Sequence, residues 1–189
     1  MLYSLALFVH ILGALGLFVA LGLEWTGLRQ LRRATTGAQA RELVTALAVL
    51  PLLYAPAAVA ILLPGLYMAA AVWGWGVGWT SVALAALVLL AVLGAALTGR
   101  RMAAIGRAVA AESGPVSPTL RQRLHDPVLW TSIQTRLAIA VGIVFLMTVK
   151  PALGGALLTI GVAALLGLAL TVPAWGRNRA LDPAARPDE

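Results

Sequence analysis

Long apolar runs, separated by short arginine-rich segments, constrain this chain more than any other feature. The chain has 189 residues, of which 61% are hydrophobic and 11% are charged. A soluble domain of this size would expose too much apolar surface. Several of the runs reach the roughly 20 residues that a helix needs to cross a bilayer. The pattern predicts an all-α fold, a polytopic transmembrane helix bundle.

Five membrane spans are expected, at residues 2–23, 47–72, 82–97, 128–149 and 153–172. The transmembrane bundle then occupies residues 1–176, and residues 177–189 form a flexible cytoplasmic tail. Two helix starts are marked by their capping residues. Thr36 and Gln39 have the spacing of a capping box, and Asp126 followed by Pro127 is a favoured N-cap and first helical position.

The excess of basic residues indicates an orientation in the membrane. The net charge is +7, and the arginines gather in residues 24–46, residues 99–127 and the tail, whereas residues 73–81 carry no charge. Short basic loops are typical of the cytoplasmic side, so we exclude nucleic acid as a partner. Five spans place the three basic segments together, with the N-terminus outside and the C-terminus cytoplasmic. A chain rich in alanine and arginine is typical of a bacterial protein, and the predicted location is the inner membrane.

Arg136 is the strongest candidate for a functional residue. It lies inside the apolar run 128–149, where an ionisable side chain costs several kcal/mol unless it is paired or hydrated. Glu24, at the end of the first span, is the only acid placed near a span in the same half of the membrane. A Glu24–Arg136 ion pair that locks the first span to the fourth is therefore one interpretation.

The other interpretation makes Arg136 a ligand site. The residues before it are polar on more than one helical face, and they include Ser132, Gln134 and Thr135. A guanidinium with hydroxyl groups nearby suits a phosphate or a carboxylate. The pattern thus predicts a cytoplasm-facing site for an anionic ligand, a lipid headgroup or a partner helix.

His10 lies in the middle of the first span, where it should face protein and make one hydrogen bond between helices. The alternative is a haem or copper ligand. The second ligand would then be a soft thioether, from Met68 or Met147, because the only other histidine lies in a polar loop. Apart from this alternative no cofactor is predicted. The chain has no cysteine, which excludes disulfides, thiolate nucleophiles and iron–sulfur clusters.

Two stretches resemble small bacterial integral membrane families of uncharacterised function. One is the first-span sequence from His10 to Ala14, an H-x-L-G-A pattern, and the other is the L-M-x-x-K-P ending from Leu146 to Pro151. More distantly, the opening helix resembles that of the CopD copper-resistance membrane domain and related haem-binding bundles. The nearer resemblance implies a membrane fold and location, without an activity.

The predicted function is that of a non-enzymatic membrane protein built around the polar site at Arg136. The alternative is a redox or metal-handling membrane subunit that uses His10. Membrane lipids, a second copy of the chain or another membrane protein are the expected partners.

Overall fold

The computed structural model describes residues 1–74 and 76–172, and every extended regular element in these residues is a helix. In chain order these elements are α1 (Leu2–Arg33), α2 (Gly37–Leu47), α3 (Pro51–Met68), η1 (Ala69–Trp73), α4 (Gly78–Leu93), η2 (Gly94–Gly99), α5 (Arg100–Ala110), α6 (Pro118–Leu124), α7 (Pro127–Val149) and α8 (Leu153–Ala169). The two η elements are π-helical turns. The predicted all-α helix bundle is confirmed.

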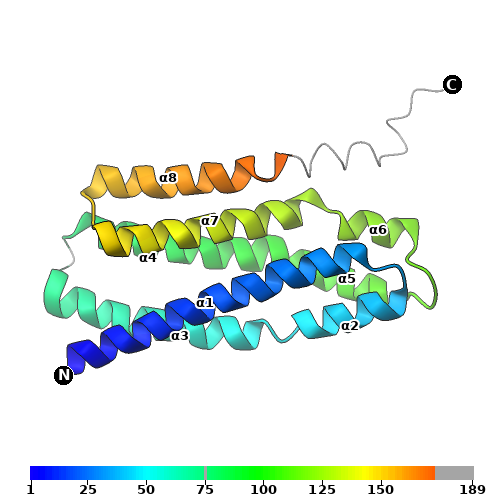
Figure 1. The fold of residues 1–189 in the computed structure, drawn as a ribbon, viewed down its shortest axis with the longest axis horizontal. Coiled ribbons are helices and arrows are strands. Elements are labelled where there is room, and N and C mark those ends of the chain that lie inside the picture. The colour runs from blue at the N-terminus through cyan, green and yellow to red at the C-terminus, as the bar shows by residue number, and fades with distance from the viewer. Residues whose placement is uncertain (75, 173–189) are drawn as a thin grey trace.

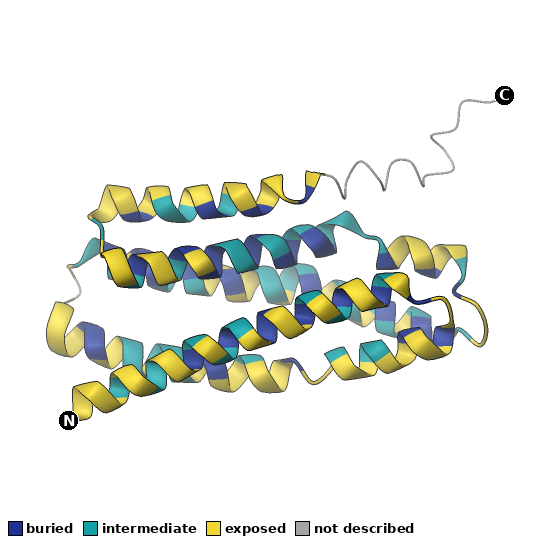
Figure 2. Ribbon diagram, in the orientation of Figure 1, coloured by how far each residue is buried: buried dark blue, intermediate teal, exposed yellow. Residues whose placement is uncertain are grey.

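Four helical stretches are long and apolar enough to cross a membrane: Leu2–Arg33, Gly37–Trp73, Gly78–Ala110 and Pro118–Val149. A fifth apolar helix, α8, has 17 residues and runs beside α7. Large apolar side chains cover the outside of the bundle, where exposed residues predominate (Figure 2). Such a surface is what a protein presents to lipid, because lipid tails are as apolar as these side chains.

The four long helical stretches extend beyond the predicted spans, whereas α8 ends three residues before the predicted end at residue 172. α1 continues ten residues beyond the predicted end at residue 23, so Glu24 lies within the helix rather than at its end. The third stretch begins at Gly78 and passes through η2 into α5. Its N-cap is Val77, with no side-chain cap. Hydropathy marks only the apolar part of a helix, whereas the backbone hydrogen bonds continue into the polar region.

Two of the predicted helix starts have the expected caps. The backbone N–H of Gln39 donates to Thr36 Oγ1 at 3.2 Å, and that of Val128 donates to Asp126 Oδ1 at 2.8 Å. The Gln39 side chain reaches back to the N–H of Thr35 rather than to that of Thr36. Asp126 also pairs with Arg101, with 2.7 Å between Oδ2 and Nε. These contacts fix where the polar helices meet the membrane-spanning ones.

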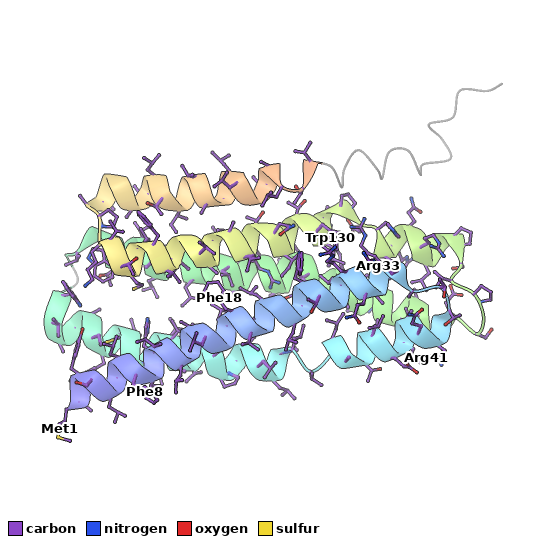
Figure 3. All side chains as sticks on the ribbon, viewed as in Figure 1. Met1, Phe8, Phe18, Arg33, Arg41 and Trp130 are labelled. Atoms are coloured by element: carbon purple, nitrogen blue, oxygen red, sulfur yellow. The ribbon has the colours of Figure 1, made fainter. Side chains whose placement is uncertain are left out.

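The bundle has two chemically different ends. At one end lie the short helices α2, α5 and α6 with most of the arginines, including Arg33 and Arg41, and we call it the basic end (Figure 3). The opposite end holds Met1, the η1 turn and the α7–α8 turn, and we call it the tryptophan end after Trp73 and Trp79. Gly74 between them has a φ of 75°, a conformation that glycine adopts without strain.

The helices form two groups that meet near the basic end. α1 packs along α3, and α7 packs against α4 and α8. The ribbons of the two groups lie farther apart toward the tryptophan end than toward the basic end (Figure 1). Two sites follow from this arrangement: a closed polar cluster where the groups meet, and a groove where they separate.

Candidate functional site

The polar cluster is built around Arg136 on α7 and Glu24 on α1. Only 4% of Arg136 and 3% of Glu24 is exposed. Arg136 Nη2 forms an ion pair with Glu24 Oε2, so the pair expected from the sequence is present in the structure. It joins the two helix groups, because α1 belongs to one and α7 to the other.

Tyr54 is the third member of the cluster, and sequence reasoning missed it. Its hydroxyl donates a hydrogen bond to Glu24 Oε2, and Arg136 Cζ lies 5.8 Å from the centre of its ring. The ring therefore offers its face to the guanidinium while its hydroxyl supports the carboxylate. The only sequence feature that could have indicated this role is the polar hydroxyl of Tyr54 near the start of an apolar run.

The other predicted ligand residues, Ser132, Gln134 and Thr135, make their contacts with helices other than α1. Ser132 Oγ lies 2.9 Å from Thr98 Oγ1 on η2, and it also donates to the carbonyl of Leu93. Thr135 has its Cα against Gly167 of α8, and the backbone carbonyl of Gln134 lies against the same glycine. The helical spacing predicted that Ser132 and Thr135 lie together beside Arg136. In the structure Ser132 bonds η2 and α4, whereas Thr135 contacts α8.

The π-helical turn η2 leaves room for Arg136. A Cβ added at Gly94 would lie 2.5 Å from Arg136 Nη1. Within the described residues, Glu24 Oε1, Arg136 Nε and Thr135 Oγ1 are buried without a hydrogen-bond partner. The cluster therefore satisfies its charges by pairing and leaves several polar atoms unused.

His10 makes the interhelical hydrogen bond that its position predicted. Its Nδ1 lies 2.8 Å from the carbonyl oxygen of Ile61 on α3. A carbonyl oxygen only accepts, so this hydrogen bond requires the proton on Nδ1, and the neutral form of the ring then has its lone pair on Nε2. Gly65 gives the ring its space, because an added Cβ would lie 3.2 Å from Cε1 and Nδ1.

A groove of about 680 Å³ lies among α1, α3, α4 and α7, toward the tryptophan end. Its lining is mostly aliphatic and aromatic, and it includes His10, Met68 and Met147. The three residues proposed from the sequence as haem or copper ligands thus line one groove. The volume is within the range of small-molecule sites in proteins.

The mouth of the groove faces sideways. Residues on the edge of α1, Leu7, Ile11 and Leu15, line the groove and are 38%, 48% and 57% exposed. Val141 and Val144 on α7 line the opposite edge, at 57% and 44% exposed. In a bundle that spans a membrane, an opening between two helices would connect the groove to the hydrocarbon of the bilayer rather than to water.

Lys150 and two tryptophans stand at the tryptophan end of the groove. Lys150 Nζ lies 4.3 Å from the centre of the Trp73 ring, and Trp73 meets Trp79 edge to face at 5.6 Å. All three residues line the groove. The third tryptophan of this segment, Trp75, lies outside the described residues.

Searches of protein-family models, of curated proteins and of solved structures found no match to this chain. The functional argument therefore depends on the geometry of the two sites.

Proposed function

We propose that this protein is a non-enzymatic integral membrane protein that binds a long-chain amphiphile in the groove. The observation that carries the proposal is the groove itself: about 680 Å³, mostly apolar, and open sideways between α1 and α7. An apolar space within the membrane is filled favourably by hydrocarbon, since an empty one forfeits its dispersion contacts. Its occupant then enters from the bilayer.

The buried cluster supports placing the ligand in the groove rather than at Arg136. An external anion at Arg136 would have to displace Glu24 from a site that is almost closed to solvent. Removing one partner of a buried pair is costly, on the order of 3–5 kcal/mol. The anion site at Arg136 remains a hypothesis, and we favour a structural role for the pair.

The location is proposed from the charge pattern. The basic end carries the arginines of α2, α5 and α6, while residues 43–99 have no charged side chain. This bias favours a basic end in the cytoplasm and a tryptophan end outside, in a bacterial inner membrane. The resemblance to small bacterial membrane families supports the same location.

The test is photolabelling of the protein in phosphatidylcholine vesicles with a phosphatidylcholine that carries a diazirine on its acyl chain. We expect label on the groove-lining residues Leu84 and Leu87 of α4. Ala14→Trp, inside the groove, should reduce that label severalfold because the indole occupies the space of the chain. Leu12→Trp, on the exposed side of α1 and outside the groove, is the matched control and should leave it unchanged.

Label confined to outward residues such as Leu158 and Leu165 of α8 would contradict the proposal. So would equal loss of label in the two tryptophan variants, since only one of them fills the groove.

A second candidate is favoured by one observation, that His10, Met68 and Met147 line the same groove. In the described residues no group of three or more His, Cys, Asp or Glu side chains forms, so a metal would depend on His10 Nε2 and a thioether. This donor set suits haem or copper. Bound haem would supply electron-transfer chemistry, while the bond from Nδ1 to Ile61 would hold the imidazole in place.

An absorption spectrum and a metal analysis of the purified protein separate the two candidates. If haem binds, a Soret band should be present and should disappear in His10→Gln. If it does not, the same variant should keep its fold at little cost, because hydrogen bonds inside membranes average about 0.6 kcal/mol. A wild-type protein with neither a Soret band nor bound copper would exclude the second candidate.

A further inference from the structure

We infer that the tryptophan end of the groove recognises the anionic phosphate headgroup of a membrane lipid, and that Lys150 and Thr80 are its ligands. The inference depends on the proposed function, because the acyl chain of the same lipid would occupy the groove. The inference specifies the chemical class of the headgroup, and it places the lipid in the leaflet at the tryptophan end.

The first argument is charge. Lys150 is the only charged side chain between residues 137 and 172, and there is none in residues 43–99 or 1–23. Among the described residues, the tryptophan end therefore has one cationic side chain and no carboxylate. The groove is lined by residues of α1, α3, α4 and α7, and each of these helices has one of its ends at the tryptophan end. An anion placed there meets an attractive charge without an acid to repel it.

The second argument is the position of the lysine. Lys150 ends α7 in the left-handed conformation, with φ 52° and ψ 53°, and its backbone N–H donates to the carbonyl of Leu146. This turn directs the chain into α8 and leaves the side chain beside Trp73, at 4.3 Å from the ring centre. A ring face attracts the ammonium without accepting all three of its N–H groups. The lysine is held at the groove and still has donors to offer.

The third argument is an unused hydroxyl. Thr80 lines the groove, and its Oγ1 is buried with no hydrogen-bond partner among the described residues. It follows Trp79, which contacts Trp73 edge to face, so Thr80 and Lys150 line the same end of the groove. A buried hydroxyl without a partner carries an energetic cost that a phosphate oxygen would remove. A neutral headgroup would leave the charge of Lys150 unpaired, and a zwitterionic headgroup would bring a cation of its own beside the lysine.

His10 lies too deep to be part of the headgroup site. It contacts Gly65, eight residues before Trp73, which corresponds to about 12 Å along a helix. The polar atoms at the tryptophan end are thus separated from His10 by an apolar stretch. This order, a cationic rim followed by an apolar groove, matches an anionic lipid with its chain directed into the bundle.

The experiment compares two photoreactive lipids with the same diazirine acyl chain, phosphatidylglycerol and phosphatidylcholine. Each is used in vesicles of phosphatidylcholine mixed equally with phosphatidylglycerol, with full-length protein. The phosphatidylglycerol probe should label Leu84 and Leu87 about fivefold more, a factor that corresponds to about 1 kcal/mol for one basic side chain near an anionic surface. Lys150→Gln should remove the preference, and Lys150→Arg should retain it. Thr80→Val should reduce it.

Four outcomes are distinguishable. Equal groove labelling by the two probes in the wild type would overturn the inference and leave the proposed function standing. Persistence of the preference in Lys150→Gln would also overturn the assignment of Lys150. Absence of groove labelling with either probe would overturn both proposals. Inorganic phosphate added in excess should not compete with the phosphatidylglycerol probe, and competition by it would indicate a site for free phosphate instead.

Discussion

At the scale of single residues, the buried cluster shows how a membrane bundle accommodates an arginine. The charge of Arg136 is balanced by Glu24 on another helix, and the Tyr54 hydroxyl supports the same carboxylate oxygen. Only 5% of each charged side chain is accessible, so neither charge is hydrated to any extent. Because the two are equally buried, the loss of either partner should strand the other in the same way.

A double-mutant cycle tests the pair. Glu24→Gln and Arg136→Gln should each lower the free energy of unfolding in micelles, on the order of 3 kcal/mol, because each leaves an uncompensated buried charge. The double variant should recover a large part of the summed loss, since no charge is then stranded. Losses that simply add would show that the residues are not energetic partners, and the anion-site hypothesis for Arg136 would regain the first place. Tyr54→Phe is the milder variant, because it removes one hydrogen bond and keeps the ring.

The cluster also shows what could be predicted at this scale. The Glu24–Arg136 pair was predictable because Glu24 directly follows the first predicted span, in the half of the membrane that holds Arg136. Tyr54 was not, because a tyrosine in an apolar run carries no charge to be balanced and its partner depends on how α3 approaches α1. Sequence spacing likewise placed Thr135 beside Arg136 without revealing that Thr135 faces α8.

At the scale of elements, Gly13 allows α1 to pack closely against α3. A Cβ at Gly13 would lie 2.8 Å from the backbone carbon of Ala60 and the backbone nitrogen of Ile61. Backbone atoms cannot turn away as a flexible side chain can, so the helices would have to separate. The Ile61 carbonyl that accepts from His10 lies at the same contact.

Gly13→Ala should therefore lower the free energy of unfolding by about 1–3 kcal/mol, the usual cost of overpacking. Gly22 lies in the same helix with no atom within 4 Å of an added Cβ, and it is the matched control. Gly22→Ala should be neutral or stabilising by up to about 1 kcal/mol, because alanine favours a helix over glycine. Denaturation of both variants in the same micelles checks the pair. Equal effects would contradict close packing at Gly13.

The π-helical turns and the true helix ends could not be read from the sequence. η1 directly follows α3, η2 joins α4 to α5, and neither turn contains a proline. Their position reflects packing, as Gly94 against Arg136 illustrates. Pro51 begins α3, whereas Pro56 and Pro64 lie inside that helix. Hydropathy gave the correct number of apolar helices, because the apolar composition of each run is a local property.

At the scale of the whole molecule, the separation of the two helix groups creates the groove. α1 and α3 hold one wall, and α4 and α7 hold the other. The groups are joined at the polar cluster, nearer the basic end, and by the Lys150–Trp73 contact at the other end. A groove between such groups cannot be predicted from runs of apolar residues, because it depends on the angle at which the helices cross.

The side of the membrane on which the C-terminal residues lie depends on whether α8 crosses the membrane. Its 17 residues extend about 25 Å, short of the roughly 30 Å of a hydrocarbon core but within the shortest spans observed. It runs along α7 toward the basic end (Figure 1). We therefore expect reporter fusions after Gly37, Gly114 and Asn178 to report the cytoplasm, and one after Gly76 to report the outside. Asn178 lies outside the described residues, so the fusion there tests α8 alone.

An external signal after Asn178, with the others unchanged, would make α8 a helix that does not cross. A cytoplasmic signal after Gly76 would instead reverse the orientation of the bundle and place the tryptophan end of the groove in the cytoplasmic leaflet.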